Sequence, residues 1–495
     1  GIEFRRNNEL LYIGLAQNKA GSGEVNRFLT HHNLEDIPLP QTAEKWHSTI
    51  VIYPLENAPE QLAQNEYLGI RPEQISMLYS SKWNSQIDKM LILQPVTFQT
   101  KKEFNLHKIL RAIDLNTLLS KLTPNDYCNN NESMSSESDL LQQYQNYPKI
   151  ISNTQAVIDK CDFQFEFDTP RNRRFYTENQ VSDMQLLRSL AYQGCEKKYG
   201  KNHKEAQERV EKELKVIDDL KFSGYFLITW DIVRYSNSMG FMHVGRGSGA
   251  NSIVSYCLGI TAICPLELNL YFERFLNLNR KSPPDFDIDW SWKERDTILE
   301  YIFNRYGKEH VAFCGTNVEF KYRSIFRELG KVFGLPKEEL DVLATTPLEN
   351  HDTNKVVKLV HEYGKMLEKY PNQRSMHSCG IIISEEPITN FTALEMPPKG
   401  FPIVQFDMHI AEDIGFDKFD ILSQRGIGHI EEATQIIKEN RGVVVDIRNP
   451  LLSKNEASAN KYLSSGNTIG CFYIESPAMR GLLRRLKCED YKTLV

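Results

Sequence analysis

The sequence predicts a multidomain protein of mixed α/β and α+β class, and three observations lead to this expectation. The chain has 495 residues, which is more than one hydrophobic core usually serves. Short apolar runs of strand length alternate with amphipathic helical stretches near its start. Helix-like and strand-like segments then continue to its end without an internal repeat. We therefore expect about three or four domains.

The composition points to an intracellular protein without membrane segments. Hydrophobic residues make up 41% of the chain, and no apolar run approaches the roughly 20 residues that cross a bilayer. The nine cysteines form no CxxC pair, so we expect neither a zinc ribbon nor disulfides, and a cytoplasmic location. The net charge of −6 argues mildly against nucleic-acid binding, although local basic patches matter more. The start, GIEFRRNNELLYIGLA, does not have the pattern of a signal peptide. The first residue is not Met and the sequence stops at YKTLV, so we expect an excised fragment.

The elements can be assigned in chain order. Residues 1–120 predict a small α/β unit, with strands in LLYIGLA, STIVIYPL and DKMLILQPVTF and a helix in EVNRFLTHHNL. The polar segment 124–139 is expected to be a flexible surface loop or linker. Helical periodicity then marks 202–221, 224–239, 293–306, 318–372 and most of the last 70 residues. Strand character returns in HVAFCG, CGIIIS, FPIVQFD and GFDKFDIL.

Acidic residues alternate with large apolar ones in the segment PDFDIDW. On a strand, Asp285, Asp287 and Asp289 share one face. Carboxylates this close repel each other unless a cation lies between them, and Mg²⁺ prefers such oxygen ligands together with phosphate. A half-buried strand with a solvated acidic face is the alternative, but Asp is disfavoured in strands. Asp289 is the weakest candidate ligand, because its side chain can instead hold a nearby basic residue.

A glycine-rich loop precedes this segment. Gly245, Arg246, Gly247 and Ser248 lead into an apolar helix, so backbone N–H groups, a hydroxyl and a guanidinium can face an anion at a helix N-terminus. The loop lacks the Gly-Lys-Ser/Thr of a Walker A motif. No clear strand leads straight into it, which argues against a dinucleotide fingerprint. Taken alone, the loop is as well explained by a turn with a helix cap.

The loop and the acidic segment together resemble the nucleotidyltransferase superfamily, in which such a loop holds a triphosphate and the acids hold metals. The segments GYFLITWDIVRYSNSMGFMHVGRGSGANSIVSYCLGIT, PLELNLYFERFLN and PPDFDIDW resemble, more specifically, the palm of the bacterial C-family DNA polymerases, the family of the DNA polymerase III alpha subunit. The later segments YGKEHVAFCGT, FRELGKVFGL, SMHSCGIIIS, VQFDMHIAEDIGFDKFDIL and GCFYIESPAMRGLLRRL resemble its palm, thumb and fingers, in the family's order over roughly 155–495.

The resemblance implies a division into five segments around a polymerase beta-like palm with a mixed sheet. The expected segments are a partial PHP domain at 1–150, the palm at 151–317 and 373–423, a helical thumb at 318–372 and the start of the fingers at 424–495. The family's His-x-His metal motif is absent, and His31-His32 is the only close histidine pair. We expect no working phosphoesterase or proofreading site in the first segment.

The resemblance also implies roles for single residues. Asp285 and Asp287 match the two motif aspartates, and Asp420 matches the third catalytic one. Gly247 and Ser248 match the loop that contacts the incoming triphosphate, with Gly245 and Arg246 supporting it. Lys418 matches a lysine that faces phosphate or the primer end. His377 stands at the family's His-Ala-Gly-Gly position, followed here by SCG, and is interpreted as structural or peripheral.

Two clusters of basic residues are candidates for DNA contact. The first, called the basic stripe, comprises Lys321, Arg323, Arg327 and Lys331, and the second comprises Arg480, Arg484, Arg485 and Lys487. Such clusters neutralise phosphates without reading sequence, but they are also common on solvated helix faces. The resemblance favours DNA contact for the basic stripe.

The resemblance implies template-directed transfer of deoxynucleotides to a primer 3′-hydroxyl, with two Mg²⁺ ions held by Asp285, Asp287 and Asp420. Implied partners are primer–template DNA and deoxynucleoside triphosphates and, in the full-length parent, the sliding clamp and other replisome subunits. We expect this chain alone to be weakly active or inactive. Two alternatives stay open: a catalytically silent DNA-binding or structural fragment, and a nucleotidyltransferase that uses no template.

Overall fold

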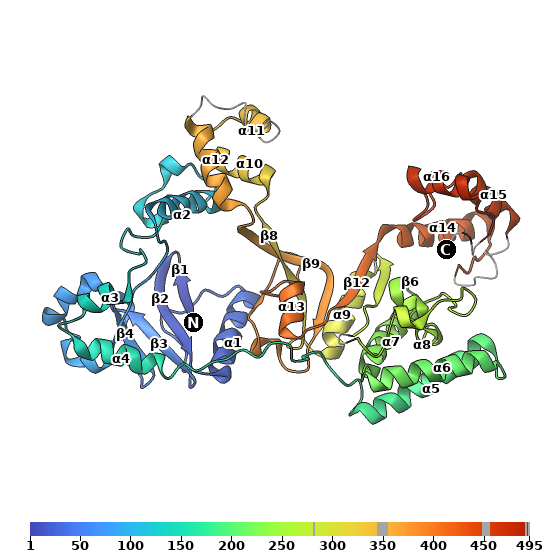
Figure 1. Cartoon of the computed structure of the whole chain (residues 1–495), viewed down its shortest axis with the longest axis horizontal. Coiled ribbons are helices and arrows are strands. Elements are labelled where there is room, and N and C mark those ends of the chain that lie inside the picture. The colour runs from blue at the N-terminus through green and yellow to red at the C-terminus, as the bar shows by residue number, and fades with distance from the viewer. Residues whose placement is uncertain (281–282, 344–354, 448–455, 491–492, 494–495) are drawn as a thin grey trace. The chain divides into compact units, whose positions relative to one another are not determined.

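A computed structural model describes residues 1–280, 283–343, 355–447, 456–490 and 493. They form two compact units whose elements are labelled in Figure 1. Unit 1 comprises 1–167, 315–376 and 388–407, and unit 2 comprises 168–314, 377–387 and 408–495. Two of the five passages of the chain between the units lie within strands, β8 (Val311–Glu319) and β9 (Pro371–Ile383). Within the described ranges, no helix is both long and apolar enough to cross a membrane.

Unit 1 contains a five-stranded sheet in chain order. Its strands are β1 (Ile2–Arg6), β2 (Glu9–Ala16), β3 (Thr49–Pro54), β4 (Glu66–Ile70) and β5 (Met90–Ile92). The first three pair antiparallel and the last three parallel. Asn7 and Asn8 make the tight β1–β2 turn with φ of 51° and 67°, a conformation that asparagine tolerates. Helices α1 (Lys19–Glu35) and α4 (Pro148–Ile158) pack on β2 and β5, which confirms the α/β character expected for 1–120.

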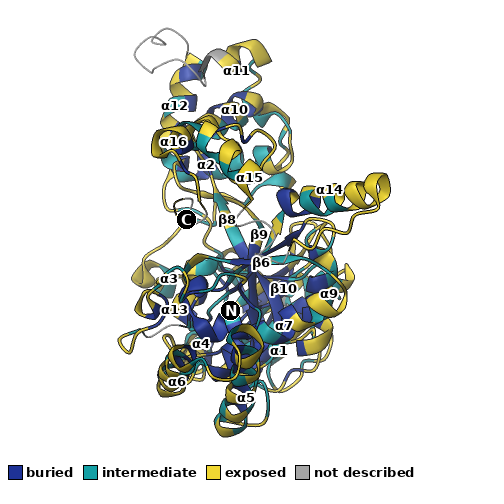
Figure 2. Cartoon of the chain, turned by 90° about the vertical axis from the view of Figure 1, so that its right-hand side faces the viewer, coloured by how far each residue is buried: buried dark blue, intermediate teal, exposed yellow. Residues whose placement is uncertain are grey.

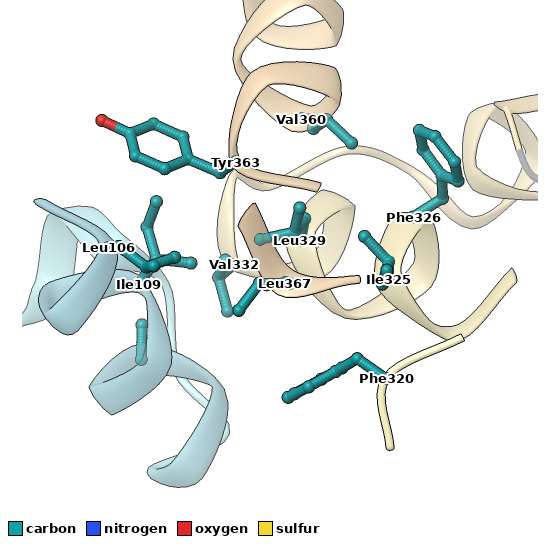
Figure 3. Close-up of a cluster of buried hydrophobic side chains, with 11 residues drawn as sticks. Leu106, Ile109, Phe320, Ile325, Phe326, Leu329, Val332, Val360, Tyr363 and Leu367 are labelled. Atoms are coloured by element: carbon teal, nitrogen blue, oxygen red, sulfur yellow. The ribbon is translucent and has the colours of Figure 1, made fainter. Parts of the chain in front are cut away.

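A helical core in unit 1 joins segments that are far apart in sequence. Helix α2 (Lys101–Asp114) packs with α10 (Tyr322–Val332) and α12 (Lys355–Leu367), and Figure 3 shows their apolar side chains converging. Helix α2 begins with a capping box in which Thr100 Oγ1 accepts from the Glu103 N–H at 3.3 Å. Leu329 lies at the centre with 0% exposure. The expected helical segment 318–372 is thus helical over α10, α12 and α11 (Lys337–Leu343), and its ends belong to β8 and β9.

The polar segment 124–139 is better ordered than the linker that its sequence suggests. The Thr97 N–H donates to the Glu132 carbonyl at 2.8 Å, and the Met134 N–H donates to the Phe98 carbonyl at 2.9 Å. Ser136 caps α3 (Glu137–Gln143) by accepting from the Asp139 N–H. Low complexity hides these contacts because serine and asparagine stabilise turns and helix starts as readily as they fill linkers.

Unit 2 is built around four neighbouring strands in the order β9, β12 (Phe419–Gln424), β7 (Asp287–Ser291) and β6 (His243–Arg246). Strand β12 runs parallel to β7 and antiparallel to β9, and β6 pairs antiparallel with β7 at the edge. The surrounding helices include α5 (Gln180–Tyr199), α6 (Lys204–Asp219), α7 (Ser223–Ser238) and α9 (Arg295–Tyr306). Three of these match the predicted helices, and Gly307 ends α9 with φ of 96° as expected.

The sequence expectation for the start of the glycine-rich loop was wrong. Strand β6 leads directly into it, whereas we expected no clear strand there. Because β6 is a four-residue edge strand with a single apolar side chain, Val244, it lacks the alternating pattern that reveals longer strands. The apolar helix predicted after the loop is also shorter than expected, since a 3₁₀ turn occupies Gly247–Asn251 and α8 spans only Ile253–Cys257.

The last 70 residues are mainly helical, as predicted, in α14 (Arg425–Arg441), α15 (Ala457–Ser465) and α16 (Pro477–Leu486). Helix α14 is buried only in its first turn, at Gly426, Ile427 and Gly428, and Figure 2 shows most of its length exposed. The described residues therefore give a mixed α/β protein in two units. The stretch 388–407, expected within the palm, belongs to unit 1, and the five expected segments stay a prediction.

Candidate active site

Three carboxylates from two strands meet in unit 2. Asp285 precedes β7, Asp287 is the first residue of β7, and Asp420 is the second residue of β12. One oxygen atom of each lies within 4.8 Å of the other two. Asp285 is exposed, Asp287 is partly buried and Asp420 is buried. We call this group the acid trio, and the described residues contain no second group of metal-ligand side chains of this size.

Strand register places the acid trio. Asp420 on β12 is the parallel partner of Asp287 on β7, so their side chains leave the sheet on one face. Asp285 lies two positions before Asp287 and shares that face by strand alternation. On the other strand neighbour of β12, Asp420 pairs with Gly380 of β9. The juxtaposition of Asp420 with the two motif aspartates, expected from the sequence, is present in the fold.

The opposite face of β7 is packed into the core. Phe286, Ile288 and Trp290 are at most 4% exposed, as the alternating pattern predicted. The Tyr225 ring of α7 stacks on Phe286 with ring centroids 5.6 Å apart and on Phe419 with centroids 4.6 Å apart. This aromatic layer fixes β7 and β12 relative to α7, and so it fixes the two strands that carry the acid trio.

The surroundings of Asp285 and Asp287 raise the pKa of both carboxyl groups. Burial raises the pKa of Asp285, and the negative charge of Asp420 raises it further. Burial also raises the pKa of Asp287, although the Arg246 guanidinium opposes this shift. Clustered and partly desolvated carboxylates are therefore poised to accept a cation, because a divalent ion removes the repulsion that raises their pKa.

Lys418 lies among the acids rather than outside them. Its Nζ donates to Asp420 Oδ2 and lies 3.4 Å from Asp285 Oδ2. Burial alone lowers the pKa of Lys418, but the hydrogen bond and charge of Asp420 outweigh it and raise the pKa. The side chain is 20% exposed. The sequence expectation that Lys418 lies near the acids is met, and its predicted contact with phosphate or a primer end stays a prediction.

Asp289 does not join the acid trio. Its buried carboxylate accepts from Arg246 Nε at 2.8 Å and from the Tyr473 hydroxyl at 3.2 Å. Arg246 also lies 3.3 Å from Asp287 Oδ2. Asp289 thus binds a basic residue, Arg246, which is the alternative role that the sequence left open for it. Sequence reasoning missed Tyr473, whose contact depends on the fold bringing the C-terminal segment back to β7.

The glycine-rich loop lies against Asp287. Gly247 has φ of 75°, and a Cβ atom built there would lie 3.0 Å from Asp287 Oδ2, so this position requires glycine on both counts. The helix that follows differs from the expectation of a free N-terminus. The Val254 N–H donates to the buried Glu213 carboxylate at 3.2 Å, and the Ser255 N–H donates to Ser252 Oγ at 3.1 Å. An anion at this loop would therefore face the turn Gly247–Asn251 rather than the start of α8.

His377 lies within β9, three residues before Gly380. Its Nδ1 accepts from the Gly380 N–H at 2.8 Å, and Gly380 is the strand partner of Asp420. Burial lowers the pKa of His377, and the nearby Asp420 charge partly restores it. This is a structural contact next to the acid trio, in line with the structural or peripheral interpretation.

The basic stripe lies in unit 1 on α10, and all four of its residues are exposed. Two of them have acidic neighbours: Arg327 lies 3.5 Å from Asp341, and Lys331 lies 2.8 Å from Glu328. On α16, Arg480 donates to the Gly466 carbonyl at 3.0 Å, which ties part of the second basic cluster to its own segment. These contacts leave the DNA-binding role of both clusters a prediction.

Unit 1 also contains a cavity of about 660 Å³ at the carboxyl ends of β3 and β4. This is where parallel sheets commonly bind ligands. Its lining combines arginines with carboxylates, among them Arg5, Arg71 and Glu56, so it favours no single ligand charge. The expectation that this region holds no working phosphoesterase site stays a prediction.

The residues of the acid trio fit a hard divalent cation. They supply only carboxylate oxygens, which are the ligands that Mg²⁺ and Mn²⁺ prefer. In the described part of the chain, Asp420 Oδ1 is buried without a hydrogen-bond partner, and such an atom is costly unless a ligand satisfies it.

Comparisons with known proteins agree with this site. Residues 185–423 match the family model described as the bacterial DNA polymerase III alpha NTPase domain, and residues 427–495 match the bacterial DNA polymerase III alpha subunit finger domain. All members of the acid trio lie inside the first match.

Similar curated proteins carry the same family names. An error-prone DNA polymerase of Symbiobacterium thermophilum is 30% identical over 425 residues, which are 82% of this chain and 38% of the relative. A DNA polymerase III subunit alpha of Halalkalibacterium halodurans is 30% identical over 425 residues, 81% of this chain and 38% of the relative. The Bacillus subtilis protein of that name is 31% identical over 371 residues, 71% of this chain and 33% of the relative.

This chain therefore spans well under half the length of the relatives that it matches. Two family models cover most of it, and relatives of both names align with at least seven-tenths of its residues. The chain belongs to the bacterial C-family DNA polymerases, the family of the DNA polymerase III alpha subunit.

Proposed function

We propose that this chain carries the catalytic palm of a template-directed DNA polymerase, which transfers deoxynucleotides to a primer 3′-hydroxyl. The observation that carries the proposal is the acid trio, with Asp420 paired to Asp287 across parallel strands and all three carboxylates within 4.8 Å. The palm is proposed to be of the polymerase beta-like nucleotidyltransferase type, and 1–150 to be what remains of a PHP domain. Family membership supports the palm assignment, and the two matched family models begin at residue 185, beyond the proposed PHP remnant.

The acid trio is proposed to hold two Mg²⁺ ions. When bound, such ions supply Lewis acidity for the primer hydroxyl and neutralise charge on the triphosphate. Asp285, Asp287 and Asp420 would act as their ligands, and Asp287 also lies next to Gly247 of the loop. Lys418 offers a cationic group beside Asp285 and Asp420, suited to a phosphate or to the primer end. Most of the rate gain comes from positioning and charge neutralisation.

The glycine-rich loop is proposed to bind the triphosphate through Gly245, Gly247 and Ser248. Arg246 has a supporting role, because Asp289 and Asp287 already occupy its guanidinium. Burial lowers the pKa of Arg246, but the negative charges of Asp289 and Asp287 outweigh this effect and raise the pKa. The guanidinium therefore stays positively charged. The loop therefore contributes backbone donors and one hydroxyl rather than a free arginine.

The basic stripe on α10 is proposed to bind the phosphates of primer–template DNA. Lys321 and Arg323 form no ion pair with an acidic residue in the described part of the chain, and they are exposed at the start of α10. Such binding does not depend on sequence and weakens with salt. In the full-length parent, the sliding clamp and other replisome subunits are further proposed partners.

Primer extension tests the proposal. The full-length parent and this chain alone are each incubated with a primed template, Mg²⁺ and deoxynucleoside triphosphates. We expect template-directed extension by the parent and weak or no extension by the isolated chain. Asp287→Asn in the parent should lose roughly a thousandfold in extension rate, because it keeps its fold while losing one ligand charge. Extension by Asp287→Asn at the wild-type rate would refute the role of the acid trio.

The same assay separates the two alternatives. Incorporation that ignores the template identifies a non-templated nucleotidyltransferase. Binding of DNA and Mn²⁺ without any incorporation identifies a catalytically silent DNA-binding fragment. The short coverage of the relatives favours this second alternative for the isolated chain, since the parent contributes residues that this chain lacks.

A further inference from the structure

A buried ion pair on α6 reaches the glycine-rich loop. Glu213 is fully buried, and its carboxylate accepts from Arg209 Nε at 2.7 Å one helical turn earlier. The same carboxylate accepts from Ser252 Oγ at 2.8 Å and from the Val254 N–H at 3.2 Å. One carboxylate therefore holds both the cap residue of α8 and the first turn of that helix.

Arg209 extends this network to the other end of the turn. Its second nitrogen donates to the Asn251 carbonyl at 3.3 Å and to the Leu270 carbonyl at 3.1 Å. The Asn251 side chain in turn donates to the Ser248 carbonyl at 2.9 Å. A continuous series of hydrogen bonds thus runs from α6 through Asn251 to Ser248, which is the proposed triphosphate contact.

The burial of this pair calls for an explanation beyond packing. Its neighbours on α6 are apolar and fully buried, namely Val210, Leu214 and Ile217. An apolar residue in place of Glu213 would continue that core without the cost of desolvating a charge. Burial raises the pKa of Glu213, and the hydrogen bonds from Arg209 and Ser252 lower it in part. Among the described residues, the hydrogen-bond partners of the pair beyond α6 all belong to the segment 251–270, so the pair orders the region of the loop.

We propose that the Glu213–Arg209 pair is a positioning element for the triphosphate, which sets the Gly247–Asn251 turn against Asp287. The inference rests on the proposed function. Neither residue contacts the acid trio, so both are positioning residues rather than catalytic ones. The turn lies close to Asp287, because a Cβ atom added to Gly247 would be only 3.0 Å from Asp287 Oδ2. Small displacements of the turn therefore change this contact.

The pair should affect binding of the triphosphate more than the chemical step. The acid trio depends on β7, β12 and the aromatic layer, which the pair does not contact. A displaced turn therefore weakens the contacts that hold the triphosphate in the ground state and leaves the metal ligands in place. Loss of such contacts raises KM with little change in kcat.

Steady-state extension kinetics with one deoxynucleoside triphosphate tests this assignment. Glu213→Gln keeps the shape and an oxygen acceptor for Ser252 but removes the charge opposite Arg209. We expect its KM to rise about tenfold, with kcat within about twofold of wild type. Equilibrium binding of a fluorescent deoxynucleoside triphosphate with Mg²⁺ gives a second readout that does not need turnover, and the same tenfold weakening is expected.

The matched control is Glu211→Gln on the same helix. Glu211 forms an exposed ion pair with Arg188 at 2.6 Å and has no contact with the loop, so its loss should leave KM unchanged. Ser252→Ala is a milder variant that removes one hydrogen bond of the network and keeps the ion pair; we expect a smaller rise in KM. It keeps the proposal testable if Glu213→Gln fails to fold, which a thermal melt reveals.

An unchanged KM and unchanged triphosphate affinity in the folded variants would overturn the positioning role, as would a loss confined to kcat. Failure of the proposed function looks different. Normal extension by Asp287→Asn, or incorporation without regard to template, rejects the polymerase assignment. Triphosphate binding by the Glu213→Gln variant remains measurable in either case, so the two failures are distinguishable.

Discussion

The acid trio of unit 2 and the basic stripe of unit 1 are both rows of like charge, but the molecule holds them in different ways. The acids project from two paired strands whose register fixes their separation, and an aromatic layer supports both strands from below. The bases project from one helix into solvent, and two of them are partly neutralised by acidic neighbours. The first arrangement suits a ligand that demands fixed geometry, and the second suits a ligand that demands only charge.

The largest expected effect is on metal binding by the acid trio. Asp420→Asn removes the charge of the one buried ligand, and we expect Mn²⁺ affinity to fall at least about tenfold because a hard cation depends on carboxylate charge. Asp289→Asn lies on β7, the strand paired with β12, but outside the acid trio, and its Mn²⁺ affinity should stay within about twofold. Titration calorimetry with Mn²⁺ measures both. An equal loss of Mn²⁺ affinity in the two variants would show that the acid trio is not the set of metal ligands.

The next effect concerns the basic stripe. The double variant Arg323→Glu with Arg327→Glu reverses two charges, and we expect duplex DNA affinity at low salt to fall about tenfold, with a salt slope smaller by about two. Fluorescence anisotropy over a salt series gives both numbers. Lys365→Glu on α12 is a matched control for general loss of positive charge in unit 1. Unchanged affinity at low salt in the double variant would reject DNA contact by the stripe.

A carboxylate at the far end of β7 gives a smaller, pH-dependent effect. Burial and the charge of Glu431 raise the pKa of Glu294 from its usual 4.5 to about 7. The folded state thus favours the protonated form, and the stabilisation present below pH 4.5 is lost as the pH rises through 7. Glu294→Gln should therefore raise the free energy of unfolding by about 1 kcal/mol at pH 8, discounted for partial exposure, and by little near pH 4.5.

Denaturant unfolding at several pH values measures this effect. Glu300→Gln, at an exposed position of the same helix, is the control and should leave the pH dependence as it is in the wild type. A gain for Glu294→Gln that is constant across pH would contradict electrostatic repulsion as its source.

The smallest effect tests how tightly the C-terminal segment is joined to the strand of the acids. Tyr473→Phe removes the hydroxyl that donates to Asp289, which keeps its stronger contact to Arg246. We expect KM for the triphosphate to rise about twofold, which corresponds to a fraction of a kcal/mol for one shared hydrogen bond. Tyr462→Phe, an exposed tyrosine on α15, serves as the comparison and should have no effect.

The sequence predicted the structure best where a short residue pattern is compatible with only one local arrangement. Alternation in PDFDIDW gave both the buried face of β7 and the direction of its acids, and helical periodicity gave α6, α7 and α9. The partner of Asp287 was predictable only from the resemblance to a family, because no local pattern states which strand lies beside β7. Strand β6 was missed because an edge strand of four residues carries too little apolar signal.

Contacts between distant segments were beyond the reach of the sequence alone. Nothing near Glu213 or Tyr473 indicates that they meet Ser252 and Asp289. The packing of α2 with α10 and α12 was equally hidden, since each helix shows only that one of its faces is apolar and not what covers it.

The parallel pairing of β7 and β12 has a consequence for how the protein is made. Lys418 stands 133 residues beyond Asp285, and the intervening chain includes much of unit 1. Closing a loop of that length costs about 4 kcal/mol of chain entropy, which only the finished sheet repays. A ribosome therefore releases the first two acids long before the third exists, and the emerging polypeptide carries no assembled metal centre until its synthesis has passed β12. The three carboxylates can therefore bind a metal together only after β12 has been synthesised.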